Sequence, residues 1–207
     1  ISVRCRQTLE EADFIAAEDT RVTLKLLNHL GIKKNLVSYY EHNKASKGNV
    51  ILERILNGET CALVSDAGSP AISDPGEDLV KQCASAGITV CAIPGPCAAI
   101  TALSISGQAT GRFCFEGFLP QKKGRNSRLE VLATEERTMI IYESPFRLVK
   151  TLEQLAEVMG SERRASVSRE ISKLHEDTQR GTLLELAEHY KQTPPKGEIV
   201  LIVEGKK

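Results

Sequence analysis

The sequence lacks a surplus of charge of either sign, and it lacks any long apolar run. Its 207 residues contain 27 Lys+Arg and 27 Asp+Glu, so the formal net charge is zero. Domains that bind nucleic acid through a broad basic surface carry a net positive charge, so any such contact has to come from local patches. No stretch approaches the roughly 18 consecutive apolar residues of a membrane-spanning helix, so we expect no membrane partner.

The cysteines and histidines lack the spacing of a metal site. None of the six cysteines forms a C-x-x-C pair, and most have apolar neighbours, which is typical of small buried residues in a reducing cytoplasm. The four histidines are scattered along the chain. We therefore expect no metal, no disulfide framework and a cytoplasmic protein.

Several catalytic motifs are also missing. There is no G-x-G-x-x-G after a strand, no Walker A loop, no G-x-S-x-G turn and no H-E-x-x-H helix. These absences argue against dinucleotide binding, phosphoryl transfer from a nucleoside triphosphate, and nucleophilic or metal-assisted hydrolysis. Group transfer that needs only a positioned donor and acceptor, with a base for the acceptor proton, stays open.

What the first half does contain is an alternation of helical and strand-like patterns. Helices are expected at residues 3–12, 20–30 (capped by Thr20), 50–56, 79–86 and 98–106, and strands at 14–17, 36–39, 61–64 and 88–93. Strands separated by single helices predict a mostly parallel sheet covered on both faces. The fold class is therefore α/β.

A break at residues 107–112 predicts two domains, 1–109 and 110–207. In the second domain we expect strands at 113–117, 138–142, 165–169 and 198–203, helices at 145–158 and 183–190, and a basic loop at 119–128. The last strand closely follows Pro194-Pro195-Lys196-Gly197, so the second sheet is expected to be mixed.

Two loops of small residues follow consecutive predicted strands of the first domain. The first is Ser65-Asp66-Ala67-Gly68-Ser69-Pro70-Ala71-Ile72-Ser73-Asp74-Pro75-Gly76, and the second is Pro94-Gly95-Pro96-Cys97-Ala98-Ala99. Ligands of open α/β sheets bind beyond the carboxyl ends of strands, and small residues let backbone amides approach them. The two loops predict one cleft for a small polar ligand, although either alone fits an ordinary surface turn.

Polar clusters lie at three further strand ends. They are Glu18-Asp19-Thr20-Arg21, Tyr142-Glu143-Ser144-Pro145, and Arg169-Glu170 with Lys173, His175 and Glu176 behind it. Charged residues at strand ends are commonly just solvated. Because all three clusters lie at the carboxyl ends of predicted strands, their shared position favours a ligand-binding site.

These segments carry a resemblance. AEDTR (17–21), SDAGSPAISDPG (65–76), PGP (94–96), YESP (142–145) and REISKLHE (169–176) occur in order, and the sequence resembles the tetrapyrrole-methylase superfamily over essentially its whole length. Within it, the chain looks like the branch that methylates the 2′-hydroxyl of a cytidine ribose in small-subunit ribosomal RNA. The resemblance implies two α/β domains, S-adenosylmethionine in the cleft between them, and a homodimer.

The resemblance also implies site residues. The methyl donor is expected at Ser69, Pro70, Ile72, Pro94, Gly95, Cys97, Ala98, Tyr142 and Ser144. Cys97 stands where the family usually has a smaller residue such as serine. Family members begin with a strand and a TPIGNLEDI-like loop, so the resemblance implies an upstream segment before Ile1, without which the chain would bind the donor poorly.

A ribose hydroxyl must lose its proton as the methyl group arrives, and carboxylates at strand ends are the candidate bases. The catalytic candidates are Asp19, Glu143, Glu170 and Lys173, with Glu170 and Lys173 expected near the ribose. Candidate RNA contacts are Arg21, Lys122, Lys123, Arg125 and Arg169. A tetrapyrrole methyltransferase and a non-catalytic RNA- or nucleotide-binding relative are the alternatives; the basic loop and the 4% aromatic content favour RNA.

Overall fold

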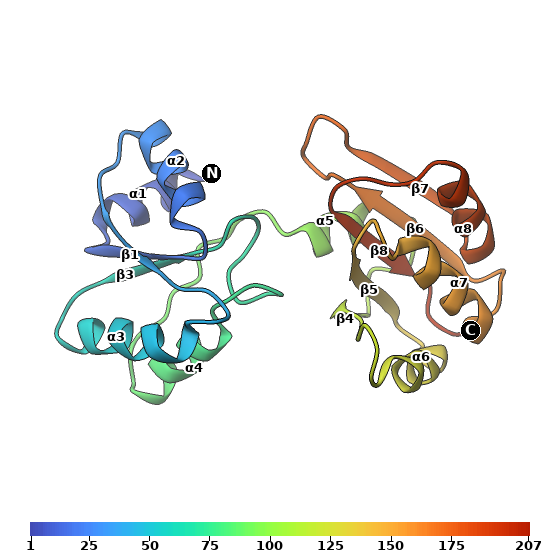
Figure 1. Ribbon diagram of the computed structural model, residues 1–207, viewed down its shortest axis with the longest axis horizontal. Helices are drawn as coiled ribbons and strands as arrows, with labels where there is room; N and C mark the ends of the chain where they lie inside the picture. The colour runs from blue at the N-terminus through green and yellow to red at the C-terminus, as the bar shows by residue number, and fades with distance from the viewer. The chain divides into compact units, whose positions relative to one another are not determined.

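The computed structural model describes residues 1–207, and the chain divides into two compact units, Ile1–Cys97 and Ala98–Lys207 (Figure 1). Each unit has its own sheet and its own apolar core. The division precedes the position expected from the sequence, between residues 109 and 110. Helix α5, Ala98–Ile105, packs on the sheet of unit 2, and it therefore belongs to that unit.

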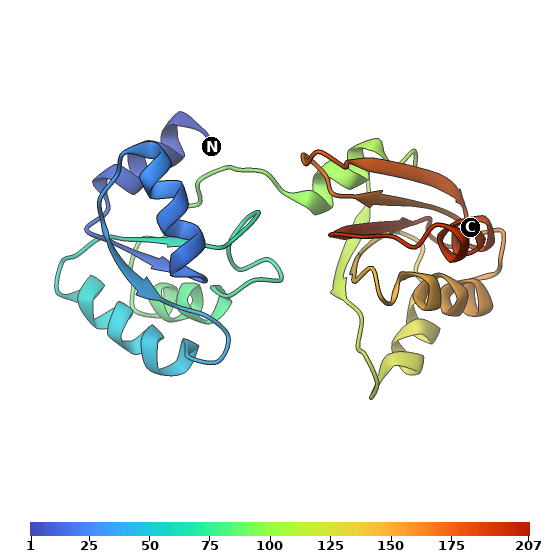
Figure 2. The same ribbon diagram turned by 45° about the horizontal axis from the view of Figure 1, so that its top comes forward.

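Unit 1 is a three-layered α/β structure. Its strands are β1 (Phe14–Ala17), β2 (Asn35–Ser38) and β3 (Cys61–Val64), and its helices are α1 (Val3–Glu11), α2 (Thr20–Leu30), α3 (Lys44–Leu56) and α4 (Glu77–Ser85). The strands are parallel, in the order β2-β1-β3. Helices α1 and α2 cover one face, and α3 and α4 cover the other (Figures 1 and 2). The predicted parallel sheet with two covered faces is confirmed.

The alternation of side chains along β1 builds the two cores of unit 1. Ile15 packs among the residues of α1 and α2, including Leu27, whereas Phe14 and Ala16 point to the other face and pack with Ile51 of α3. All four residues of β1 are completely buried. A central parallel strand that is buried on both faces reads as a continuous apolar run, as this one does.

Two sequence-based expectations for unit 1 are wrong. Residues 88–93 form no strand, because no neighbouring strand pairs with them; Val90 is 50% exposed. Apolar alternation favours a strand but cannot supply a partner for its backbone groups. In addition, α2 is capped by Asp19, whose carboxylate accepts a hydrogen bond from the Arg21 amide, and Thr20 is the first helical residue.

Unit 2 contains a mixed sheet, as the sequence predicted. Its strands are β4 (Phe113–Phe118), β5 (Thr138–Glu143), β6 (Arg164–Arg169), β7 (Asp177–Thr182) and β8 (Ile199–Val203), and its other helices are α6 (Arg125–Ala133), α7 (Leu148–Met159) and α8 (Leu183–Gln192). The strand order is β4-β5-β8-β6-β7, and only β4 and β5 pair in parallel. Figures 1 and 2 show α6, α7 and α8 on one face and α5 on the other.

The topology of unit 2 brings three loops to one edge of the sheet. Glu143 at the end of β5 and Arg169 at the end of β6 both pair with Ile199 of β8. Since both strands run antiparallel to β8, they run parallel to each other, and so does β4. The loops that follow β4, β5 and β6 therefore leave from the same edge, which we call the loop edge of unit 2.

The sequence did not predict α6 or β7. Helix α6 begins inside the expected basic loop, and it buries Leu129 and Leu132 against the core. Strand β7 reads DTQRGT, without apolar alternation, because it lies at the end of the sheet, where polar residues are tolerated and limit pairing with other chains. No helix in the chain is both long and apolar enough to cross a membrane.

Candidate functional site

In unit 1, the segments that follow β1 and β3 are bonded to each other. The amide of Asp19 donates to Asp66 Oδ1 at 3.2 Å, and the amide of Asp66 donates to Glu18 Oε2 at 3.4 Å. The polar cluster 18–21 and the first small-residue loop, 65–76, thus form one structure at the carboxyl end of the sheet. This is the edge at which open α/β sheets bind ligands.

The first small-residue loop has an unusual backbone. Ala71 and Ser73 have φ of 69° and 61°, a left-handed conformation that non-glycine residues rarely adopt. Gly76 has φ of 147°, and a Cβ there would lie 2.9 Å from Leu63 Cδ2 and 3.0 Å from Ala71 N. Such strained positions persist only where the surrounding structure holds them, and they cluster at ligand-binding sites.

The second small-residue loop lies beside the first. A Cβ on Gly68 would lie 4.0 Å from the carbonyl oxygen of Pro96, which is ordinary van der Waals distance. Pro94 and Gly95 are exposed, and Ile72 on the first loop is 46% exposed. Six of the expected donor residues therefore lie on two neighbouring loops of unit 1, namely Ser69, Pro70, Ile72, Pro94, Gly95 and Cys97.

The side chain of Asp19 is hydrogen-bonded to Arg21. Its carboxylate accepts from the Arg21 amide at 2.8 Å and from the guanidinium at 3.0 and 2.6 Å. These hydrogen bonds lower the pKa of Asp19 to about 2. A carboxylate this acidic is a weak proton acceptor at neutral pH. The Arg21 side chain is 87% exposed, so it can reach a phosphate while it stabilises Asp19.

Glu143, a candidate base in unit 2, is buried and fully engaged. Its Oε1 accepts from the Ser144 amide at 2.7 Å and from Arg147 Nε at 2.9 Å, and its Oε2 accepts from Thr151 Oγ1 at 2.6 Å. The side chain is only 1% exposed. This carboxylate holds the turn between β5 and α7, and each of its oxygens is bonded within the protein.

The basic residues 122–125 differ in exposure: the arginine is buried and the two lysines are not. Arg125 is 6% exposed, and its guanidinium donates to Pro120 O at 3.1 Å, Thr151 Oγ1 at 2.7 Å and Gln154 Oε1 at 2.8 Å. The expectation that Arg125 contacts RNA is therefore corrected, because the residue joins α6 to α7 inside the fold. Lys122 and Lys123 are exposed.

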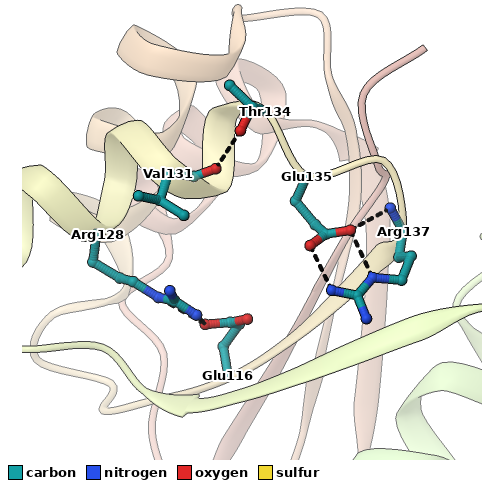
Figure 3. Close-up of polar contacts among 6 residues, drawn as sticks. All are labelled: Glu116, Arg128, Val131, Thr134, Glu135 and Arg137. Atoms are coloured by element: carbon teal, nitrogen blue, oxygen red, sulfur yellow. Dashed lines mark hydrogen bonds and ion pairs between the residues drawn. The ribbon is translucent and has the colours of Figure 1, made fainter.

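Arg128, which follows on α6, is also occupied. Its guanidinium is paired with Glu116 of β4, and its Nε lies 3.0 Å from Glu116 Oε2 (Figure 3). Figure 3 shows a second exposed arginine, Arg137, whose guanidinium donates to both carboxylate oxygens of Glu135. Of the basic run 122–128, the two lysines are the cations that remain open to a ligand.

Glu170, Lys173 and Glu198 form an ionic group at the loop edge of unit 2. Lys173 Nζ lies 3.0 Å from Glu170 Oε1 and 3.0 Å from Glu198 Oε2. The hydrogen bond from the Glu198 amide, followed by that from Lys173, lowers the pKa of Glu170, and the two carboxylates raise the pKa of Lys173. The lysine is therefore a fixed cation, 45% exposed.

The backbone of this group is strained as well. Glu170 and Ser172 have φ of 53° and 65°. Together with Ala71 and Ser73 they are the only four non-glycine residues of the chain with positive φ. All four lie in segments that the sequence marked as candidate sites, which is the distribution expected of functional loops.

Tyr142 has aromatic neighbours that were not expected from the sequence. Its ring packs edge to face with Phe115, at a centroid distance of 5.1 Å, and with Phe118, at 5.7 Å. Phe115 is 39% exposed and Phe118 is 54% exposed. The sequence shows that β4 is rich in phenylalanine, but only the fold shows that these rings stay exposed on an edge strand, which indicates a contact surface.

Arg169 lies at the end of β6 and is half-buried, with Nη1 donating to Lys196 O at 3.5 Å. It lines a cavity of about 230 Å³ together with His189, Tyr190 and Lys196. The cavity adjoins the loop edge of unit 2, so Arg169 keeps a position from which it can contact a phosphate.

The chain is similar to known methyltransferases. The profile of the family described as Tetrapyrrole (Corrin/Porphyrin) Methylases matches residues 1–187. Over 209 residues, the chain is 49% identical to "Ribosomal RNA small subunit methyltransferase I" of Haemophilus influenzae, covering 100% of this chain and 74% of that protein. The protein of the same name from Thermotoga maritima is 43% identical, with 100% of this chain and 92% of that protein covered.

The fold is also found among solved structures. Diphthine synthase superposes with a TM-score of 0.75 at 14% identity, covering 100% of this chain and 85% of that one. Uroporphyrin-III C-methyl transferase from Thermus thermophilus, complexed with S-adenyl homocysteine, superposes with a TM-score of 0.67 at 18% identity, covering 99% and 90%. The chain belongs to the tetrapyrrole methylase family and, within it, to the group of ribosomal RNA small subunit methyltransferase I proteins.

Proposed function

We propose that the chain transfers a methyl group from S-adenosylmethionine to the 2′-hydroxyl of a cytidine ribose in small-subunit ribosomal RNA. The observation that carries this proposal is the similarity, over the whole of this chain, to proteins named Ribosomal RNA small subunit methyltransferase I, at 49% identity for the Haemophilus influenzae protein. The strained backbone at Ala71, Ser73, Glu170 and Ser172 supports it, because both loops that the reaction would use carry stored strain.

The donor residues are Ser69, Pro70, Ile72, Pro94, Gly95 and Cys97 of unit 1 and Ala98, Tyr142 and Ser144 of unit 2. The neighbouring small-residue loops fit such a ligand, since exposed backbone at Pro94 and Gly95 leaves peptide groups open to a polar molecule. Exposed Ile72 supplies an apolar contact. S-adenosylmethionine supplies a methyl group on a positively charged sulfur, so the protein's task is to orient the acceptor toward it.

On the acceptor side, Glu170 and Lys173 act as a pair. The carboxylate of Glu170 holds the ammonium group of Lys173 and is the proposed acceptor of the ribose proton. The Lys173 cation stabilises the negative charge that develops on the ribose oxygen as that proton leaves. Asp19 and Glu143 serve the structure instead, because one is held at a pKa of about 2 and the other has no free oxygen. Arg21, Lys122, Lys123 and Arg169 are the proposed phosphate contacts.

The proposed setting is the cytoplasm, where ribosomal RNA is made and assembled, and the proposed working form is a homodimer. Light scattering of the purified protein measures the mass in solution. A monomer that methylates at full rate would remove the dimer from the proposal and leave the reaction intact.

The test is incorporation of tritiated methyl from labelled S-adenosylmethionine, with small ribosomal subunits, naked small-subunit RNA and a precorrin-type tetrapyrrole as parallel acceptors. Label in RNA that maps to a ribose 2′-oxygen of a cytidine by mass spectrometry is the expected result. Label in the tetrapyrrole alone would replace the proposal with small-molecule methylation. Binding of RNA without label in any arm would indicate a non-catalytic relative.

A further inference from the structure

Phe146 is the most exposed large apolar side chain of the protein. It is 97% exposed, and apart from Leu174, at 93%, no other large apolar residue exceeds 75%. Phe146 lies in the turn between β5 and α7, and Leu174 lies in the loop after β6. Both turns leave the loop edge of unit 2, so the two side chains share one end of the sheet.

The turn that carries Phe146 is rigidly held. The buried Glu143 carboxylate bonds the Ser144 amide and Arg147 on either side of it. The carbonyl of Ser144 accepts from the amides of Arg147 at 3.0 Å and Leu148 at 3.1 Å, and the Phe146 amide donates to Ser144 Oγ at 3.3 Å. A fixed turn that presents a bare ring loses little conformational entropy when a ligand covers the ring.

Two exposed cations lie in a neighbouring loop of the same edge. Lys122 and Lys123 lie in the loop after β4, the strand that pairs with β5. The carboxylates of this edge are occupied within the fold: Glu170 and Glu198 bond Lys173, and Glu176 accepts from the Ser172 amide at 2.6 Å. A flat apolar face beside cations is the combination with which proteins hold unpaired nucleotides, by stacking on bases and pairing with phosphates.

We propose that Phe146 stacks on an unpaired base of the acceptor RNA and thereby positions the strand for reaction. This inference rests on the proposed function and assigns a specificity-determining contact within it. A protein partner fits less well, because a stable protein interface covers about 800 Å² on each side and needs a packed apolar patch rather than a single projecting ring.

The kinetic test compares Phe146→Ala, Phe146→Leu and Phe146→Tyr with the unaltered chain, using small ribosomal subunits as acceptor. Loss of one stacked base corresponds to a rise in KM for the RNA substrate of about five- to hundredfold, with KM for S-adenosylmethionine unchanged. The alanine and leucine variants are expected to show the same rise in KM for RNA, because neither side chain has an aromatic face. The tyrosine variant is expected to keep the KM of the unaltered chain. Val131→Ala, at a 57% exposed position on α6, is the control.

A fluorescence test needs no methyl transfer. The chain contains no tryptophan, so Phe146→Trp introduces a single indole at the proposed stacking position. A short oligocytidylate is expected to quench it, whereas inorganic polyphosphate, which supplies charge without bases, is not. Val3→Trp, at a 75% exposed site on α1, should respond to neither.

The outcomes separate this inference from the proposed function. If the unaltered chain methylates RNA but Phe146→Ala keeps a normal KM and the introduced indole is not quenched, the stacking role is overturned and the reaction stands. If the unaltered chain methylates nothing while oligocytidylate still quenches the indole, the contact stands and the reaction fails.

Discussion

The amide of Glu198 donates a hydrogen bond of 2.9 Å to the carboxylate of Glu170, and the amide of Glu170 donates one of 2.9 Å to the carbonyl of Glu198. The start of β8 is thereby bonded to both the backbone and the side chain of a residue with φ of 53°. Because Lys173 is held by these same two glutamates, the reciprocal pair decides where the proposed catalytic ammonium group lies.

Gly197 makes this arrangement possible, and its replacement should disable it. A Cβ at residue 197 would collide with Glu170 Oε1, so Gly197→Ala has to push the carboxylate away. We expect the rate of methyl transfer to fall at least tenfold, which corresponds to about 1.4 kcal/mol. The positive φ of 85° adds a loss of stability of about 1–2 kcal/mol.

Gly160→Ala is the matched control. Gly160 has φ of 93°, but a Cβ at this position would meet no atom within 4 Å, so the variant carries the backbone cost without the collision. Both variants should lose stability in urea titrations, and only Gly197→Ala should lose activity. Equal activities in the two variants would remove the Glu170 carboxylate from the proposed acceptor site.

The Asp19–Arg21 pair predicts a pH dependence of stability. The pKa of Asp19 is about 2 in the folded protein, below its ordinary value of 3.8, so the folded state binds the proton less tightly than the unfolded state. The contribution is fully present above about pH 4 and is lost as the pH falls toward 2. Asp19→Asn keeps a capping side chain but loses the charge, and should be less stable than the unaltered chain at pH 7.

Urea titrations at intervals between pH 7 and pH 2 measure this difference. The two unfolding curves should converge at the acid end of the range. A difference that stays constant across the whole range would mean that the Asp19 charge does not contribute.

Thr151 predicts a large effect from a small change in the core. Its hydroxyl donates to Glu143 and accepts from Arg125, and it is completely buried. Thr151→Val keeps the shape but leaves two buried charged groups each short of one partner, so unfolding should become easier by about 1–3 kcal/mol. Thr134→Val, which removes only the exposed bond to Val131 seen in Figure 3, should change stability by less than about 0.5 kcal/mol.

The sequence predicted those elements whose apolar pattern agrees with their pairing. Residues 14–17 and 61–64 were placed correctly, because a short apolar run between helices is what a buried parallel strand requires. Residues 88–93 have the same kind of pattern and form no strand, since pairing depends on a neighbour that the pattern does not encode. Helix α6 was missed because only a few of its residues face the core.

The sequence also located the candidate loops, but it did not show which partners their charged residues bond within the fold. From the sequence, Glu143 and Arg125 were both expected to be free to contact a substrate. In the structure Glu143 accepts a hydrogen bond from the Thr151 hydroxyl, and Arg125, 26 positions away in the chain, donates one to the same hydroxyl. Contacts between residues so far apart depend on how α6 packs on α7. A charged residue at a strand end can therefore be identified from sequence, whereas its freedom to meet a substrate cannot.

Lys122 and Lys123 should govern the affinity for RNA through charge alone. Both are exposed, whereas Arg125 is buried and Arg128 is paired with Glu116. Replacing both lysines with glutamate should weaken RNA binding and reduce the slope of log affinity against log salt by about one per lysine, because fewer counterions are released. The same double change at Lys25 and Lys47, which are exposed on α2 and α3, controls for net charge. Filter binding to small-subunit RNA over a series of salt concentrations gives both slopes. Equal slopes in the two double variants would show that Lys122 and Lys123 act only through the total charge of the protein. The phosphate contacts would then have to be sought at Arg21 and Arg169.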